Sequence, residues 1–117
     1  MKPLLPTLKE KKRYVVYELL TRERVAGSPE REILTHLRNT LGLFDAAAAG
    51  ILPVQYDGKR QAGILRVSTR SLDKVRGAFL LLKSVERQRV VPRIIGVSGT
   101  LAGARRFLPN ERTIMNE

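Results

Sequence analysis

The chain has 117 residues, enough for one domain with a buried core. It has no cysteine, which excludes a disulfide scaffold and a thiolate metal site, and no apolar run approaches the roughly 20 residues of a membrane span. Its 22 Lys and Arg residues against 11 Asp and Glu give a net charge of +11, which favours a polyanionic partner, with nucleic acid the leading candidate.

The first predicted feature is an N-terminal arm, residues 1–9, which Pro3 and Pro6 keep extended. The residues that follow at 13–20 (RYVVYELL) are rich in β-branched and aromatic side chains. Such a composition is typical of a strand, and the run is apolar on nearly both faces.

The next element is a helix that begins at Ser28 and Pro29. A hydroxyl at the N-cap and a proline at the first helical position are typical of a helix start, and apolar residues at helical spacing continue to Gly42. The four alanines at residues 46–49 favour helix locally, whereas a nearby glycine and proline favour a turn or tail. Both readings stay open.

A hairpin is predicted from two strands at residues 51–56 and 62–68, which flank a glycine-containing loop at 57–60. Pro53 lacks the amide that an interior strand needs on both sides. The strand at 51–56 should therefore lie at an edge of its sheet.

A second helix is predicted for residues 70–84, capped by Ser68 or Thr69. Its apolar stripe is widened by Leu80 and Leu81, which suggests contacts on two sides. A last strand at 89–97 and a short basic helix at 100–108 complete the pattern.

The order strand, helix, strand, strand, helix, strand predicts an α+β fold of the ferredoxin-like βαββαβ type. Its single antiparallel sheet would carry two helices on one face, followed by the short C-terminal helix. We expect one domain over 1–117, with an extended arm at 1–9, a core at 10–108 and a tail at 109–117. The RNA-recognition motif shares this scaffold but stacks bases on aromatics of both central strands, and the central strand at 62–68 has none.

Residues for catalysis or metal binding are scarce. His36 is the single histidine and is expected to be structural, no Gly-x-Ser-x-Gly elbow is present, and Asp45, Asp57 and Asp73 are too dispersed for a two-metal site. We therefore predict no catalytic residue, no bound cofactor or metal, and no small-molecule substrate for this chain.

A glycine-rich segment, residues 96–100 (GVSGT), stands before the last helix. It lacks the spacing and the lysine of a P-loop. Its backbone amides could cradle one phosphate, or its glycines could simply turn the chain out of the strand. The candidate phosphate-loop residues are Gly96, Ser98, Gly99 and Thr100.

The excess positive charge falls into three blocks, at residues 1–13, 58–76 and 87–112. A surface that serves only solubility would scatter its charge. The side chains predicted to contact RNA phosphates are Lys9, Lys11, Lys12, Arg13, Arg66, Arg105 and Arg106, and for each the alternative is a solvated surface charge.

Three segments together resemble protein component 2 of archaeal ribonuclease P: residues 5–14 (LPTLKEKKRY), 63–67 (GILRV) and 94–101 (IIGVSGTL). The resemblance implies an RNA-binding subunit of the ribonuclease P holoenzyme, in which the RNA component, with Mg²⁺, removes the 5′ leader of precursor tRNA. It implies as partners the ribonuclease P RNA, precursor tRNA in the holoenzyme, and protein component 3, with which the subunit forms a pair of heterodimers.

The sequence also lacks an apolar signal segment at its N-terminus, so we expect a cytoplasmic protein without membrane contact. Two other functions remain open at this stage. One is an RNA-binding or interaction subunit of another ribonucleoprotein, and the other is a freestanding small nuclease, because a ferredoxin-like scaffold hosts many activities.

Overall fold

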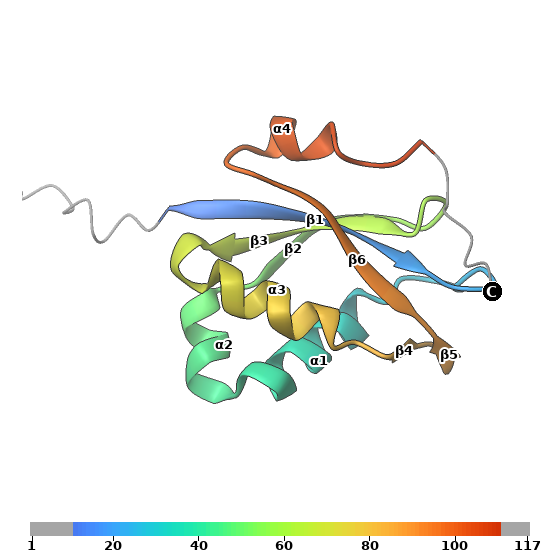
Figure 1. Ribbon diagram of the computed structural model, residues 1–117, viewed down its shortest axis with the longest axis horizontal. Coiled ribbons are helices and arrows are strands. Elements are labelled where there is room, and N and C mark those ends of the chain that lie inside the picture. The colour runs from blue at the N-terminus through green and yellow to red at the C-terminus, as the bar shows by residue number, and fades with distance from the viewer. Residues whose placement is uncertain (1–10, 111–117) are drawn as a thin grey trace, which may run out of the picture.

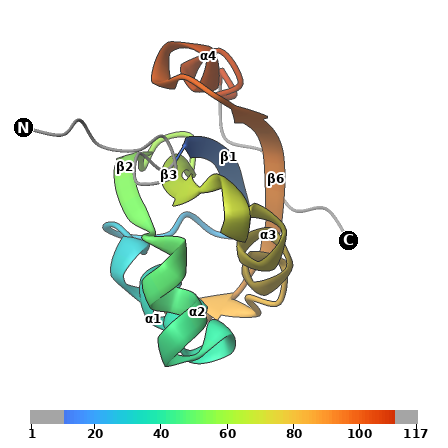
Figure 2. The ribbon, with the colours of Figure 1, turned by 90° about the vertical axis from the view of Figure 1, so that its left-hand side faces the viewer.

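The computed structural model describes residues 11–110, and the predictions for the arm at 1–9 and for most of the tail lie outside them. One antiparallel sheet is enclosed between two layers of helix (Figure 1, Figure 2). Its strand order is β2-β3-β1-β6, which confirms the predicted α+β fold. The strands are β1 (Lys12–Leu20), β2 (Leu52–Asp57), β3 (Ala62–Ser68) and β6 (Val91–Ser98).

Three helices cover one face of the sheet, and α4 lies alone on the other. The alanine run, for which helix and turn were both open, forms a helix of its own, so this layer has one helix more than predicted. The helices are α1 (Glu30–Leu41), α2 (Leu43–Ala49), α3 (Leu72–Leu80) and α4 (Leu101–Arg105).

The alternation of side chains along β1 divides the core in two. Val15, Tyr17 and Leu19 are buried against α1 and α3 in the larger cluster. Val16 faces the other way and is buried with Ile64 of β3 beneath Ala104 of α4. The near-continuous apolar run of β1 thus reflects a strand buried on both faces, as the sequence predicted.

The second helix is shorter than predicted. It is preceded by a 3₁₀ turn at Thr69–Ser71 and ends at Leu80 instead of residue 84. The chain beyond it forms a two-stranded hairpin of β4 (Ser84–Val85) and β5 (Gln88–Arg89). The prediction followed the apolar spacing, which continues through Leu82, and missed the pairing that takes the next residues out of the helix. The last strand consequently begins at 91, and not at 89.

Local signals placed the other boundaries well. Gly42 ends α1 at a φ of 86°, a conformation that favours glycine. The strand with Pro53 lies at the edge of the sheet, as predicted. The N-cap of α1 is Pro29, one residue later than predicted, and the Oγ of Ser28 accepts a long 3.5 Å hydrogen bond from the amide of Glu30.

Within residues 11–110, no helix is long and apolar enough to cross a membrane.

Candidate nucleic-acid interface

The segment at residues 96–100 connects β6 to α4 and caps the N-terminus of that helix. The amide of Thr100 donates to Ser98 Oγ over 3.2 Å, and Thr100 Oγ1 accepts from the amide of Gly103 over 3.1 Å, so Thr100 is the N-cap of α4. A Cβ on Gly103 would collide with Ser98 Oγ. These contacts supply a structural reason for the Gly-Val-Ser-Gly-Thr sequence, and a phosphate bound at this loop stays a prediction.

The C-terminal end of α4 rests on β6 through one close contact. A Cβ on Gly96 would lie within 2.8 Å of three ring carbons of Phe107, so the absence of a side chain on Gly96 makes room for the ring. Hydrogen-bonded turns carry the chain from Ala104 to Leu108 beyond the helix. The predicted basic helix at 100–108 is thus α4 followed by these turns.

Three of the four predicted RNA-contacting arginines gather on the side of the sheet that α4 covers. Arg66 on β3 shares the face of Ile64, two residues earlier, and Arg105 and Arg106 are exposed at the end of α4. Arg105 Nε donates to Gln55 Oε1 on β2 over 3.0 Å. Arg13 starts from the opposite face of β1, the face of Val15, but its Nη1 lies 3.6 Å from the position of a Cβ on Gly99, in the loop before α4. We define the α4 surface as Arg13, Arg66, Arg105, Arg106 and Phe107.

Hydrogen bonds hold the first described residues at the start of β1. The backbone carbonyl of Lys11 accepts hydrogen bonds from both the amide and the hydroxyl of Thr69, each over 3.0 Å. Lys12 Nζ reaches the C-terminal end of α2, 3.6 Å from the position of a Cβ on Gly50. Lys11 and Lys12 are thus held at the start of β1, next to α2 and the 3₁₀ turn, whereas Lys9 lies outside the described residues. We call Lys11 and Lys12 the root of the predicted arm.

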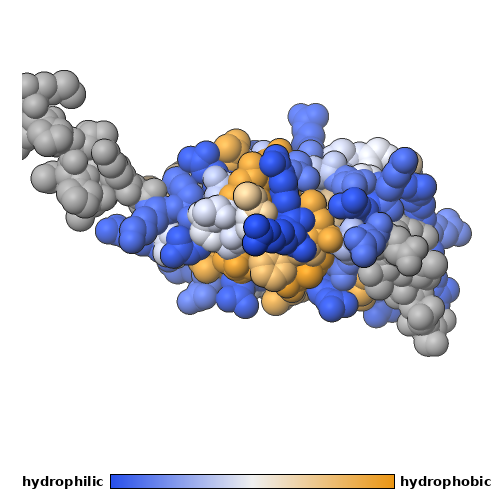
Figure 3. Space-filling view, turned by 90° about the horizontal axis from the view of Figure 1, so that it is seen from above, coloured by the Kyte–Doolittle hydropathy of each residue, from blue (hydrophilic) through white to orange (hydrophobic). Residues whose placement is uncertain are grey.

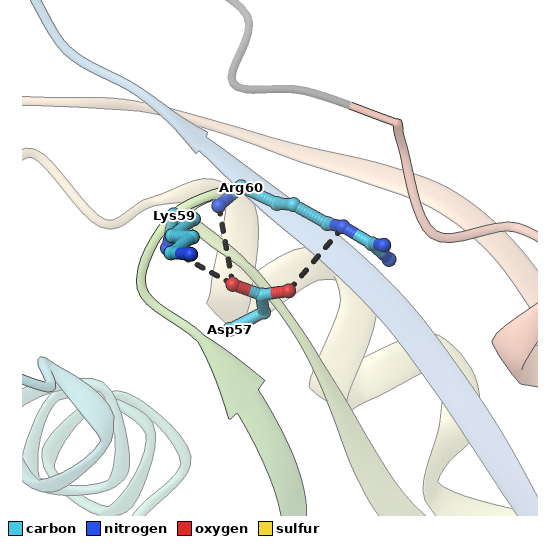
Figure 4. Close-up of polar contacts among 3 residues, drawn as sticks. All are labelled: Asp57, Lys59 and Arg60. Carbon is cyan, nitrogen blue, oxygen red and sulfur yellow. Dashed lines mark hydrogen bonds and ion pairs between the residues drawn. The ribbon is translucent and has the colours of Figure 1, made fainter.

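Other cations of the basic blocks are engaged with carboxylates. In the hairpin between β2 and β3, Asp57 accepts from the backbone amides of Lys59 and Arg60, and Arg60 Nε lies 3.3 Å from Asp57 Oδ2 (Figure 4). In the helix layer opposite α4, Lys74 Nζ of α3 lies 3.3 Å from Asp45 Oδ1 of α2. These pairs lower the local excess of positive charge away from the α4 surface.

The sheet offers no open aromatic platform. Tyr17 is buried, stacks on Tyr56 with ring centroids 6.5 Å apart, and meets Phe79 edge-on at 5.1 Å. Burial raises the pKa of Tyr17 far above its usual value. For Tyr56, burial followed by the negative charge of Asp57 raises the pKa to about 12. Tyr14 is half-buried in the cluster beneath α4.

The candidate catalytic residues do not converge. His36 Nε2 lies 2.7 Å from the carbonyl oxygen of Ala78, which joins α1 to α3 as a structural contact. Asp45 pairs with Lys74 and Asp57 with Arg60. Within residues 11–110 there is no group of three or more His, Asp or Glu side chains that could hold a metal ion.

Two apolar surfaces are exposed in the layer opposite α4. One lies at the end of α3, where Leu80 and Leu81 are 52% and 59% exposed and Val91 at the start of β6 is 41% exposed. The other is on α2, where Leu43 and Phe44 project into solvent. The widened stripe that the sequence indicated on the second helix is therefore a solvent-exposed surface at its C-terminal end.

The fold and the α4 surface define a small, strongly basic α+β protein whose sheet is covered on both faces. Residues 13–109 match the model of the Rpp14/Pop5 family. Three relatives, each a ribonuclease P protein component 2, come from Archaeoglobus fulgidus, Thermococcus gammatolerans and Methanococcus vannielii. They are 36%, 34% and 33% identical to the chain, covering 91%, 90% and 86% of it and 95%, 88% and 77% of their own lengths.

The chain belongs to the Rpp14/Pop5 family and is a ribonuclease P protein subunit. This membership confirms the resemblance drawn from the three sequence segments. Sequence reasoning also selected the arginines of the α4 surface, but it missed Phe107, although the sequence Arg-Arg-Phe at 105–107 places an aromatic side chain directly after two cations.

Proposed function

We propose that this subunit binds the ribonuclease P RNA through the α4 surface and the root of the arm, and so helps that RNA hold its active form. The RNA, with Mg²⁺, performs the removal of 5′ leaders from precursor tRNA in the cytoplasm, and this chain contributes no catalytic group. The observation that carries the proposal is that Arg66 of β3 and the arginines at the end of α4 lie on one side of the sheet, with Arg13 Nη1 close to the loop before α4.

The cations of this surface would contact phosphates and position the RNA without reading its sequence. Each phosphate contact displaces counterions, so the affinity falls with salt. Removing two contacts should lower the magnitude of the slope of log affinity against log salt by roughly 0.7 to 0.9 per contact. Lys11 and Lys12 at the arm root, and Lys9 beyond it, would add contacts of the same kind.

The test compares two double variants of equal charge change. Arg105→Ala with Arg106→Ala removes cations from the α4 surface, whereas Arg31→Ala with Arg38→Ala removes two exposed cations from α1 in the opposite layer. Binding to ribonuclease P RNA is measured over a series of salt concentrations. The first variant should bind more weakly with a shallower slope, and the second should retain both values. An equal loss of RNA affinity in the two variants would contradict the proposal, because it would show that only the net charge of the protein matters.

We further propose that protein component 3 binds at the exposed apolar surface of Leu80, Leu81 and Val91, and that the two chains assemble as a pair of heterodimers. An apolar centre with cations at its rim, here Lys83 and Arg89, favours a partner surface that is apolar with an acidic border.

A co-purification experiment tests this assignment. Leu81→Asp should abolish capture of component 3, because it places a charge in the contact, and Phe44→Asp on α2 serves as the matched control. Loss of capture with Phe44→Asp alone would move the interface to α2. Capture of neither component 3 nor the ribonuclease P RNA by the unaltered chain would contradict the whole assignment and favour another ribonucleoprotein.

A freestanding nuclease is the remaining alternative. The purified chain is incubated with precursor tRNA and Mg²⁺, with and without the RNA component. We expect leader removal only when the RNA component is present. Specific cleavage by the protein alone would overturn the proposed function.

A further inference from the structure

Phe107 combines an exposed ring with a fixed position. The residue directly follows Arg105 and Arg106, and its side chain is 43% exposed. The close approach of the ring to Gly96 supports it against the backbone of β6. Figure 3 shows this side of the molecule, on which hydrophobic residues gather near the centre and hydrophilic side chains surround and cross them.

No other aromatic side chain of the protein has this combination. All six, three Tyr and three Phe, lie within the described residues. Tyr17 and Phe79 are buried, and Tyr14 and Tyr56 are half-buried. Phe44 is 85% exposed, but it lies on α2 between Leu43 and Asp45, where the neighbours are apolar and acidic.

We propose that Phe107 stacks on an unpaired base of the RNA, while Arg105 and Arg106 bind the adjoining phosphates. Single-stranded nucleic acid is bound by a cationic surface with an aromatic ring on which a base can stack, and stacking tolerates any base. The chain covers the sheet face on which ferredoxin-like RNA-binding domains carry such rings. It presents a ring instead from the turn that follows the covering helix. The inference rests on the proposed function and adds an unpaired nucleotide as its ligand.

The first experiment separates stacking from charge. The full chain and its variant Phe107→Leu are titrated with a single-stranded oligoadenylate and with an RNA duplex. Loss of a stacked base should weaken binding of the oligoadenylate about tenfold. Affinity for the duplex and the dependence of binding on salt should not change, because no charge is removed. Phe44→Leu is the control and should bind both RNAs as the unaltered chain does.

The second experiment uses the absence of tryptophan from the sequence. Phe107→Trp introduces a single fluorophore whose larger ring can also stack, and Phe44→Trp introduces one on α2. Oligoadenylate should quench the fluorescence of the first variant and leave that of the second unchanged. The same pattern is expected on binding ribonuclease P RNA.

The outcomes distinguish this inference from the proposed function. If the unaltered chain does not bind ribonuclease P RNA, both fail. If the chain binds that RNA but Phe107→Leu keeps full affinity for oligoadenylate, or Phe107→Trp is not quenched, only the stacking role is refuted. An equal loss of affinity for single-stranded and duplex RNA in Phe107→Leu would also refute it, because that pattern indicates displacement of α4.

Discussion

Replacement of Gln61 should destabilise the fold strongly, because its side chain makes buried hydrogen bonds to a distant segment of the chain. Gln61 ends the loop between β2 and β3 and is fully buried, with a φ of 50°. Its Oε1 accepts from the amide of Val25 over 2.8 Å. Its Nε2 donates to the carbonyl of Leu19 over 3.0 Å and to Thr21 Oγ1 over 2.9 Å. One side chain therefore ties the connection after β1 to the hairpin.

The magnitude follows from the groups left behind in Gln61→Ala. The amide of Val25 is buried and loses its acceptor, and the carbonyl of Leu19 loses its donor. At about 1–3 kcal/mol for each unsatisfied buried group, the loss is roughly 3–5 kcal/mol in the free energy of unfolding. Gln61→Gly removes the same hydrogen bonds but suits the left-handed backbone, so it should be more stable than Gln61→Ala by about 1 kcal/mol.

Urea unfolding followed by circular dichroism measures both variants against the unaltered chain. The order of stability should be unaltered chain, then Gln61→Gly, then Gln61→Ala. A loss below about 1 kcal/mol in Gln61→Ala would refute the argument, because it would fall within the cost of a solvent-exposed hydrogen bond. If Gln61→Ala were the more stable of the two variants, the backbone part of the reasoning would be wrong.

The other predictions concern the cap of α4 and the buried tyrosines. Thr100→Ala should cost about 1 kcal/mol in urea unfolding, because the amide of Gly103 loses its capping acceptor, and Thr100→Ser should retain most of the stability. The hydroxyl of Tyr17 is buried without a hydrogen-bond partner among the described residues, so Tyr17→Phe should leave stability unchanged or raise it in the same assay. Since the pKa of both Tyr17 and Tyr56 is raised above that of the unfolded chain, their contribution to stability is complete below pH 10 and falls as the pH rises from about 10 to 12. The double variant with Phe at both positions should flatten this decline in a pH series of thermal unfolding, and an unchanged decline would contradict the assignment.

The sequence predicted the fold where local signals and tertiary packing agree. Gly42 ends α1, and Pro53 marks the edge strand. It did not resolve the alanine run, because propensity favours helix there while the neighbouring glycine favours a turn. In the structure a helix forms and Gly50, at a φ of 55°, caps it. The end of α3 was predicted too late because apolar spacing cannot reveal the pairing of Ser84 with Arg89.

The candidate site shows the same division. The basic blocks selected Arg66, Arg105 and Arg106, and the structure brings them to one side of the sheet. Which of the other cations are paired with carboxylates could not be read from the sequence. The pairing of Lys74 with Asp45, for example, joins residues that are 29 positions apart. Phe107 was passed over because its exposure depends on how the turn after α4 meets Gly96.

Covering both faces of the sheet changes what fixes the register of its strands. A slip of one residue normally turns apolar side chains toward water, and that exposure opposes the slip. Here each face of β1 meets a hydrophobic cluster, so a slipped register would still bury apolar side chains. The correct register must therefore be selected by the fit of side-chain shapes. Gly63 leaves room for the ring of Tyr17 on one face, as Gly96 does for Phe107 on the other. A shift of either strand by one residue would replace its glycine with a residue whose side chain clashes with the ring, so the two glycines favour the observed register.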